Sequence, residues 1–514
     1  MSTVDPSPGP AGSALPPDEA GIEAGPPAGA VRRGAKASAA VLVFTQGVSF
    51  AQTVVLARLL SPREVGLFAA GTVLSGLLVT FSEGGMRNAL VQRGRGVAVA
   101  AETVFWASLV GSVVWACATA AAAPLIGDLF ADPVAGLITA ATAGTIVLHA
   151  LTYVPDALMQ RRLDVRQRLV VRPAVALGFS VTAVVFALAG FGVWALVIGS
   201  YVQHVAWIAA SWSLAGWRPR RVRASWRVWR ELARFSFPLV LSGLGDKLRE
   251  LVESALVGRQ LSPTALGYYR YGRRLATLPG VGVIEVFSYV LFPAFSRIAA
   301  DPERFRETFL RALGLIWACS CPLAGLLVAI GEPAVVVLLG EKWRGAGVAL
   351  VAIAGYGPGV AMCAVGSEAI KGFGRSRLVN WLTLTSVVVG IGLLVLLLPL
   401  GLIGVGLAMS ADSLLVGVLA LVLARQVVHV TTADLTRALL PPLAATLVAG
   451  TAIGSLEHLL VGADRYGELV GVLALLAESV GFLAVFAGAL LVIAPKQSRR
   501  LALALRTFLR PAST

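Results

Sequence analysis

Charged residues are scarce in this chain: Asp, Glu, Lys and Arg make up only 14% of it, whereas 57% of the residues are hydrophobic. A soluble globular chain carries about 25% charged residues, because its surface must be hydrated. A chain of 514 residues is long enough for about three soluble domains, but this composition does not provide their polar surface. The composition excludes such an arrangement and predicts a polytopic membrane protein.

Cysteine and histidine are also few, with four residues of each. The cysteines lie within apolar stretches and show no CxxC spacing, and the histidines show neither an HxxxH nor an HExxH spacing. Redox motifs and metal sites require such spacings. The sequence therefore predicts no metal site and no cofactor.

Acidic residues are outnumbered, with 28 Asp and Glu against 43 Lys and Arg. Nucleic-acid binding would require basic residues gathered on one solvated face. Here they fall in short clusters between apolar runs. The basic excess therefore predicts membrane orientation and no nucleic-acid partner.

A membrane helix needs about 20 mainly apolar residues, and the sequence contains about fourteen such segments. They run over residues 38–60, 65–86, 101–126, 134–156, 169–190, 192–214, 236–258, 266–288, 308–330, 345–370, 378–398, 402–424, 437–456 and 469–493. If the N-terminus is cytoplasmic, 32 basic residues fall on the cytoplasmic side and 9 on the external side. This bias predicts that both termini are cytoplasmic. The expected fold class is an all-α polytopic membrane protein.

A short internal repeat divides the chain. Residues 56–68 read LARLLSPREVGLF and residues 257–269 read VGRQLSPTALGYY, with five identical pairs. Each copy follows the first helix of a six-helix block, which predicts two parallel lobes as in many transporters. Ser-Pro is a helix start, because serine caps and proline suits the first helical position. The eighth helix is therefore expected to begin at Ser262 and Pro263.

The repeat fixes the expected domain boundaries. Residues 1–36 are predicted to form a disordered cytoplasmic tail, 37–214 the N-lobe and 236–424 the C-lobe. Residues 425–514 are predicted to form two accessory helices and a basic cytoplasmic tail. Residues 215–235 form the expected linker, whose basic amphipathic pattern over 218–235 predicts a helix in the cytoplasmic interface. A lipid-headgroup or partner site is the alternative interpretation of this segment.

Ionisable residues inside predicted membrane helices mark the candidate site, since such residues face a cavity or a partner. The acids assigned to ion coupling or charge pairing are Asp246, Glu250, Glu253, Glu83 and Glu285. The residues assigned to substrate are Arg270, Arg273, Arg274, Tyr268, Tyr271, Lys247 and Arg249. Three arginines at three- and four-residue spacing predict a phosphate site, because guanidinium binds phosphate bidentately. The alternative is that these arginines reach the external headgroups or pair with Glu250 and Glu253.

Residues 56–93 and 261–298, followed by DPERFRETFLRAL (301–313) and LLGEKW (338–343), resemble the oligosaccharide flippase branch of the multidrug/oligosaccharidyl-lipid/polysaccharide exporter superfamily. The resemblance implies two six-helix lobes and two accessory helices in a bacterial cytoplasmic membrane. It implies translocation of an undecaprenyl-pyrophosphate-linked glycan by alternating access, for surface polysaccharide biosynthesis. It also implies cavity arginines that engage the pyrophosphate, with Arg270, Arg273 and Arg274 suitably placed.

The resemblance further implies membrane lipids, a polysaccharide polymerase and glycosyltransferases as partners. No catalytic residue is expected, and the chain is not expected to be an enzyme. A multidrug or cation exporter of the same superfamily is one alternative. A membrane glycosyltransferase or ligase is another, but the external acids are scattered on short connections without a DxD motif.

Overall fold

The computed structural model describes residues 28–83, 85–162, 164–219, 224–375, 377–499 and 501. The predicted disordered tail, residues 1–36, lies outside these ranges up to residue 27, whereas residues 28–36 are helical and form the start of the first helix. Within the described ranges all regular secondary structure is helical. The prediction of an all-α fold is confirmed.

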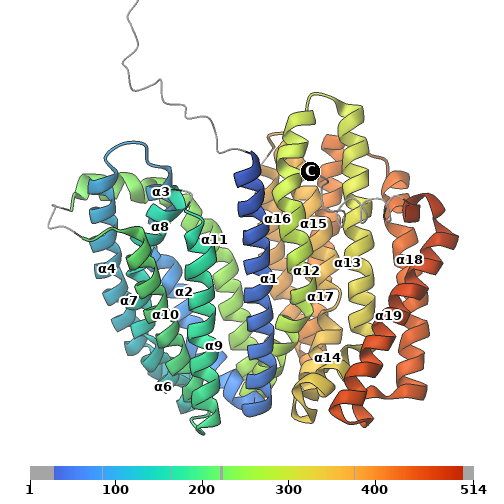
Figure 1. Cartoon of the computed structure of the whole chain (residues 1–514), viewed down its shortest axis with the longest axis horizontal. Coiled ribbons are helices and arrows are strands. Elements are labelled where there is room, and N and C mark those ends of the chain that lie inside the picture. Colours follow the sequence, from blue (N-terminus) through green and yellow to red (C-terminus); the bar gives the residue numbers. More distant parts are fainter. Residues whose placement is uncertain are drawn as a thin grey trace, which may run out of the picture.

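The helices form two side-by-side groups (Figure 1). The first part of the chain forms α1 (Ala28–Leu59), α2 (Pro62–Glu83), α3 (Met86–Gln92), α4 (Val97–Ala121), α5 (Ala123–Phe130), α6 (Pro133–Thr142), α7 (Gly144–Ala150), α8 (Tyr153–Arg161), the π-helical η2 (Gln167–Val171), α9 (Arg172–Leu188) and α10 (Val193–Ala215). The second part forms α11 (Trp226–Gln260), α12 (Pro263–Ile298), α13 (Pro302–Leu339), η3 (Glu341–Trp343), α14 (Arg344–Ile353), α15 (Tyr356–Gly372), α16 (Arg377–Leu397), η4 (Leu398–Leu400), α17 (Gly401–Val428), α18 (Thr432–Leu456), η5 (Glu457–Val461), η6 (Ala463–Arg465) and α19 (Glu468–Ile493).

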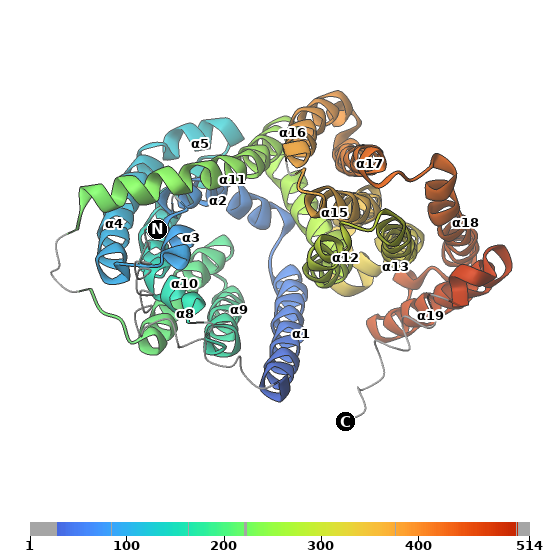
Figure 2. The ribbon, with the colours of Figure 1, turned by 90° about the horizontal axis from the view of Figure 1, so that it is seen from above.

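Two helices connect the groups. Helix α11 packs against α2, α3 and α4 of the first group and against α12 and α16 of the second, and Figure 2 shows it running along both. Helix α1 packs against α9 and also contacts α13. The groups are therefore joined by long helices as well as by direct contact between α2 and α12.

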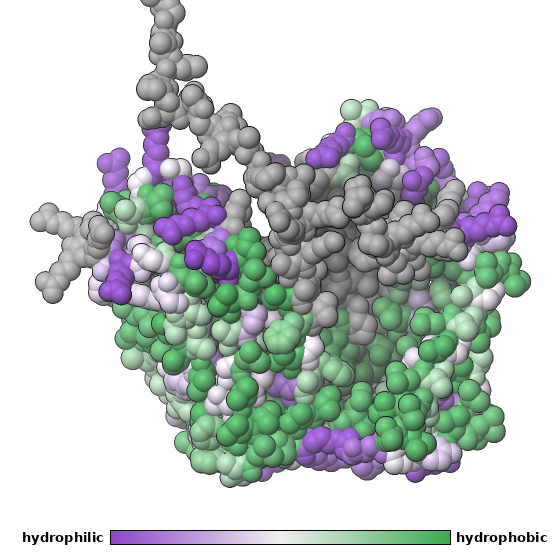
Figure 3. Space-filling model, in the orientation of Figure 1, coloured by the Kyte–Doolittle hydropathy of each residue, from purple (hydrophilic) through white to green (hydrophobic). Residues whose placement is uncertain are grey.

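The surface has the polarity of a membrane protein. Figure 3 shows an apolar belt with hydrophilic residues gathered above and below it. In the described part of the chain, ten helical segments are long and apolar enough to cross a membrane. The predicted count of fourteen is not confirmed by this criterion, and one of the ten segments, Arg377–Val428, contains both α16 and α17.

Both Ser-Pro sequences start helices as predicted. Helix α2 begins at Pro62, where the side chains of Ser61 and Glu64 each bond to the other's backbone N–H. Helix α12 begins at Pro263, and Oγ of Ser262 accepts a hydrogen bond from the N–H of Ala265 (3.0 Å). The predicted start of the eighth helix is confirmed.

The two copies of the repeat pack against each other. A Cβ atom added at Gly66 would overlap the carbonyl oxygen of Pro263, and one added at Gly267 would overlap that of Pro62. Only glycine allows α2 and α12 to approach so closely. The repeat is therefore the contact point between the two groups.

The helix predicted over residues 218–235 begins later. Residues 216–219 and 224–225 are not helical, and residues 220–223 lie outside the described chain. Ser225 supplies the N-cap, with Oγ 3.5 Å from the N–H of Val228. Helix α11 then continues without interruption through the seventh predicted membrane segment to Gln260.

Candidate functional site

Two polar cavities lie in the helical groups. The C-cavity has a volume of about 530 Å³ and is lined by α11, α12, α15, α16 and α17, with the polar residues Asp246, Lys247, Arg249, Glu250, Glu253, Arg273, Tyr356, Ser367, Glu368, Ser386, Asp412 and Ser413. The N-cavity has a volume of about 590 Å³ and is lined by α1, α3, α8, η2, α9, α10 and α12, with the polar residues Ser49, Gln52, Arg87, Asp156, Gln167, Arg172, Gln203, Trp207 and Arg274. Helix α12 thus contributes an arginine to each cavity.

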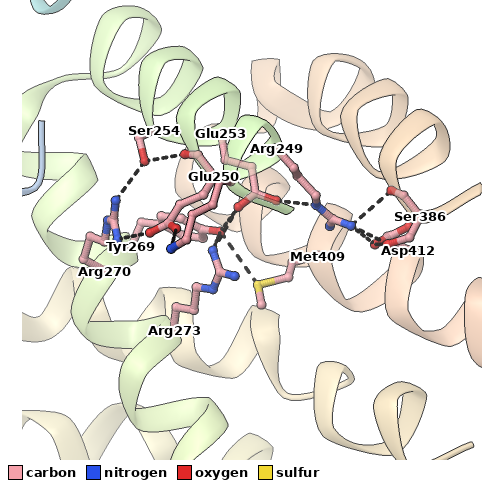
Figure 4. Close-up of polar contacts among 11 residues, drawn as sticks. Arg249, Glu250, Glu253, Ser254, Tyr269, Arg270, Arg273, Ser386, Met409 and Asp412 are labelled. Atoms are coloured by element: carbon pink, nitrogen blue, oxygen red, sulfur yellow. Dashed lines mark hydrogen bonds and ion pairs between the residues drawn. The ribbon is translucent and has the colours of Figure 1, made fainter. Parts of the chain in front are cut away.

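Arg249 is the centre of an ion-pair network in the C-cavity. Its Nε lies 2.7 Å from Oε1 of Glu253, and its Nη1 lies 2.7 Å from Oδ2 of Asp412. Nη1 also donates to Oγ of Ser386 (2.6 Å), and Figure 4 shows the guanidinium between these groups. Glu253 lies one helical turn after Arg249 on α11, at the i, i+4 spacing of a helical ion pair, whereas Asp412 comes from α17.

Two of the three predicted phosphate-binding arginines are neutralised in this network. Nη1 of Arg270 lies 2.9 Å from Oε1 of Glu250, which also pairs with Lys247 (3.0 Å). Nη1 of Arg273 lies 2.9 Å from Oε2 of Glu253. These two arginines therefore form the pairs that the sequence left open as an alternative.

The formal charges of the C-cavity nearly cancel. The network contains four cations and three carboxylates, and the exposed carboxylate of Asp246 also lines the cavity. An anionic ligand would have to compete with these carboxylates for every arginine. The C-cavity is thus a poor anion site in this conformation.

Arg274 points away from the network and into the N-cavity. Its Nη2 donates to Oγ of Ser49 on α1 (2.6 Å). Among the described residues, no carboxylate oxygen lies within 4.0 Å of its guanidinium nitrogens. Arg274 therefore keeps an uncompensated positive charge beside the cavity.

Two further arginines line the N-cavity. Arg172 is exposed at the start of α9, and Arg87 of α3 pairs with Glu83 (3.0 Å). Glu83 therefore serves in charge pairing. Three guanidinium groups surround the cavity, with Glu83 and Asp156 as the nearby acids.

The two predicted sugar-contacting tyrosines pack elsewhere. Tyr271 stacks on Trp343 with 4.3 Å between ring centroids, and Tyr268 meets the edge of the same ring at 6.2 Å. In the described chain neither tyrosine lines the N-cavity or the C-cavity. The side chain of Glu285 lies outside the described residues.

Arginines of the repeat close one end of the molecule. Arg58 at the end of α1 donates to the carbonyls of Leu338 (2.9 Å) and Val337 (2.6 Å) at the end of α13. Arg259, its counterpart in the repeat, donates to the carbonyl of Asp128 near the end of α5. Each arginine therefore binds carbonyls near the end of a helix in the other group, where the helix dipole favours a cation.

Aromatic residues reinforce this closure in the same paired way. Nε1 of the fully buried Trp343 donates to the carbonyl of Ala57 (2.7 Å). The ring of Phe130, also fully buried, covers Gly258, where it leaves no room for a Cβ. Ala57 and Gly258 occupy equivalent positions in the repeat. We call these contacts of Arg58, Arg259, Trp343 and Phe130 the outer closure.

Four functional candidates were not predicted from the sequence. Asp412 joins the C-cavity network, and Arg87, Asp156 and Arg172 line the N-cavity. Asp412 and Asp156 are single acids within predicted membrane segments, a pattern that marks a functional position. This signal could have identified both acids, whereas Arg172 resembles an ordinary basic residue at the cytoplasmic end of a helix.

Comparison with known proteins gives consistent matches. The model of the family described as polysaccharide biosynthesis protein matches residues 55–347. The succinoglycan biosynthesis transport protein ExoT of Rhizobium meliloti (strain 1021) is 27% identical over 348 residues, which cover 68% of this chain and 70% of that protein. The lipopolysaccharide biosynthesis protein WzxC of Escherichia coli (strain K12) is 27% identical over 327 residues, which cover 60% of this chain and 63% of that protein.

A solved structure shares the fold. The lipid II flippase MurJ in an inward closed conformation superposes with a TM-score of 0.68, at 16% sequence identity, over 87% of this chain and 98% of that one. At this identity the similarity establishes the arrangement of helices. The resemblance to the flippase branch that the sequence predicted is confirmed by these matches.

Proposed function

Because the chain belongs to the polysaccharide biosynthesis protein family, we propose that it moves a lipid-linked oligosaccharide across the bacterial cytoplasmic membrane. The observation that carries this proposal is the N-cavity, which Arg274 lines without a neutralising acid in contact and which Arg172 and Arg87 also line. The proposed substrate is a polyprenyl diphosphate that carries a glycan for surface polysaccharide biosynthesis. The chain acts as a transporter and not as an enzyme.

The names of the relatives support this class of substrate. One is a succinoglycan transport protein and the other a lipopolysaccharide biosynthesis protein. Both names concern the biosynthesis of a glycan-containing polymer, and the first also names transport. The carrier lipid, the polymerase and the glycosyltransferases of the pathway belong to the proposal.

The proposed mechanism is alternating access between two lobes, residues 37–214 and 236–424, with residues 425–514 as accessory helices. Both chain termini lie in the cytoplasm. The diphosphate enters the N-cavity, where Arg274 and Arg172 bind it and Arg87 adds a third positive charge. The amides of Gln52, Gln167 and Gln203 offer hydrogen bonds to the first sugar.

The outer closure seals the opposite end while the substrate loads. Arg58 and Arg259 hold the ends of α13 and α5 through backbone carbonyls, and Arg58 also pairs with the exposed carboxylate of Glu468 at the start of α19. An exposed ion pair of this kind adds little to stability. Such contacts are exchanged for water when the lobes separate, at a modest net cost for each hydrogen bond. The outer closure can therefore hold the two lobes together while the substrate loads and release them when the lobes separate.

A cation exporter of the same superfamily fits the cavities less well. The buried carboxylates of the C-cavity, Glu253 and Asp412, both pair with Arg249. A cationic substrate would have to displace that guanidinium. In the N-cavity it would meet Arg274, which has no acid to offset its charge.

The proposal is tested in a strain that lacks the gene. We expect lipid-linked oligosaccharide to accumulate on the cytoplasmic side, and the wild-type gene to restore surface polysaccharide. Arg274→Ala should reduce the surface polysaccharide at least tenfold, because the uncompensated charge is removed. Arg311→Ala, at an exposed arginine paired with Glu307 on α13, is the matched control and should restore export. Full restoration by Arg274→Ala at normal protein levels would contradict the proposed site.

A further inference from the structure

The N-cavity contains a buried carboxylate that no cation neutralises by direct contact. Asp156 on α8 is only 3% exposed. Its Oδ2 accepts a hydrogen bond from Nε1 of Trp207 (3.0 Å), and its Oδ1 is buried without a hydrogen-bond partner. Among the described residues, no Lys, Arg or His nitrogen lies within 4.0 Å of either oxygen.

The other buried carboxylates that line the two cavities differ in this respect. Glu253 pairs with Arg249 and Arg273, and Asp412 pairs with Arg249. An arginine in direct contact supplies the opposite charge that a buried carboxylate needs in place of its lost hydration. Asp156 has only the indole N–H, so ionisation leaves a buried charge without a partner, which costs several kcal/mol. Among the buried carboxylates that line the two cavities, Asp156 is therefore the one best suited to exchange a proton.

Several charged and titratable groups lie on α8 and on the helices around it. They are Glu83 at the end of α2, Arg87 on α3, Glu102 on α4, His149 on α7, Tyr153 on α8 itself, Arg172 at the start of α9 and His204 on α10. The rings of His149 and His204 lie 5.6 Å apart, and His149 lies 5.1 Å from the ring of Trp207. Within this group Arg87 and Arg172 are the cations that line the N-cavity together with Asp156.

Two features of the site therefore affect the protonation of Asp156 in opposite directions. Burial favours the protonated acid, whereas the positive field of Arg87 and Arg172 favours the carboxylate. Those arginines, together with Arg274, line the cavity proposed for the diphosphate. A bound diphosphate neutralises the positive charge of these arginines and adds negative charge of its own. Burial then favours the protonated form of Asp156 without opposition.

We propose that Asp156 is a proton-binding site of this transporter and takes up a proton when the diphosphate enters the N-cavity. The proposal rests on the proposed function, since it requires an anion in that cavity. The proton comes from bulk water on the open side and binds Oδ1, while Oδ2 keeps the Trp207 hydrogen bond. Uptake reduces the negative charge that the closed cavity must enclose.

Linkage makes the effect reciprocal. If the anion favours the proton, then the proton favours the anion by the same factor. Anion binding should therefore tighten as the pH falls, with at most about tenfold per pH unit for one linked proton. Replacement of Asp156 by Asn should remove this pH dependence and keep the acceptor for Trp207.

The experiment is isothermal titration calorimetry on the full chain in lipid nanodiscs. UDP-glucose serves as the probe, because it is a diphosphate diester that stays fully ionised around neutral pH. Titrations in two buffers of different ionisation enthalpy give the number of protons taken up per probe bound. We expect uptake in the wild type and in Asp164→Asn, a control at a loop carboxylate paired with Arg166. We expect Asp156→Asn to bind the probe without uptake.

Each outcome decides between the proposals. Equal proton uptake by the wild type and Asp156→Asn overturns the proton site, and so does binding to the wild type without uptake; neither result affects the proposed function. If the wild type does not bind the probe, the anion site fails and the proton site fails with it. Retained probe binding by Asp156→Asn, together with its loss in Arg274→Ala, shows that the Asn variant is folded.

Discussion

At the residue scale, the buried charges of the C-cavity are compensated by ion pairs that share partners. Arg249 is paired with two buried carboxylates, Glu253 and Asp412, from two different helices. The carboxylate of Glu253 also accepts a hydrogen bond from the hydroxyl group of Tyr269 (3.1 Å) and pairs with Arg273. Nearly every formal charge in the C-cavity thus has a compensating partner, which explains how α11 carries so many ionisable residues inside a membrane protein.

Removal of Arg249 should be strongly destabilising. Arg249→Met leaves Glu253 with one cation and Asp412 with none, and the loss of one partner of a buried pair costs about 3–5 kcal/mol. The measurement is the free energy of unfolding of the purified protein in detergent. Arg311→Met, whose exposed pair with Glu307 lies on α13, should change it by less than about 1 kcal/mol. Similar stabilities for the two variants would contradict the role assigned to the network.

The sequence predicted which charged residues lie inside the membrane helices more reliably than it predicted their contacts. Arg270, Arg273 and Arg274 were correctly expected inside a helix, because Ser262 and Pro263 define its start. Pairing with Glu250 and Glu253 was one of two alternatives that the sequence could not decide between, and the contact of Arg274 with Ser49 was not predicted. These partners lie on other helices, and the rotation of those helices about their axes depends on packing. A rotation of about 100° per residue separates neighbours 273 and 274, which is enough to send one into each cavity.

At the element scale, the repeat is the contact on which the outer closure is built. Gly66 and Gly267 let α2 and α12 meet at the backbone, and Arg58 and Arg259 bind the helix ends on either side. The sequence predicted the helix starts from local capping chemistry, which depends only on neighbouring residues. It did not predict that the two copies touch, because their identity says nothing about distance in space.

Substitution of Gly66 should open the outer closure. In Gly66→Ala the new methyl group would overlap the carbonyl of Pro263, which is backbone and cannot move aside without separating the helices. A cysteine introduced at the fully buried Ala57, with the four native cysteines replaced, reports opening through labelling by a membrane-impermeant maleimide. We expect labelling from outside the cell to rise severalfold.

Gly76→Ala is the matched control on the same helix, since a Cβ there would meet no atom within 4 Å. It should leave the labelling of the cysteine introduced at Ala57 unchanged. Equal labelling in the two alanine variants would show that the close approach of α2 and α12 does not hold the closure.

At the scale of the whole molecule, the basic excess is the clearest prediction of orientation. Hydrophilic residues gather at both ends of the apolar belt (Figure 3), but the count of 32 basic residues against 9 distinguishes the ends. The exceptions on the external side include Arg58 and Arg259, which the outer closure uses. The all-helical membrane fold was predictable because apolar length alone specifies it, whereas the number of spans was not, since the charged helices α11 and α12 fail a test of apolarity.

Reporter fusions test the orientation. A green fluorescent protein fused after residue 499 should fluoresce, because both termini are expected in the cytoplasm. Alkaline phosphatase fused after residue 190, in the turn between α9 and α10, should be active because that turn is expected outside. The reverse pattern, with a dark fluorescent fusion and no phosphatase activity after residue 190, would contradict the assigned orientation.

Translocation in purified proteoliposomes tests the central claim most directly. A polyprenyl diphosphate oligosaccharide with a fluorescent sugar is placed in both leaflets, and an external glycosidase measures how fast the inner pool becomes accessible. We expect rapid exposure with the wild type and with Arg311→Ala, and at least a tenfold slower rate with Arg274→Ala, because the N-cavity then loses its uncompensated charge. Transport through the N-cavity would be contradicted by an unchanged rate in Arg274→Ala. It would also be contradicted if the inner pool became accessible no faster with the wild type than in empty liposomes.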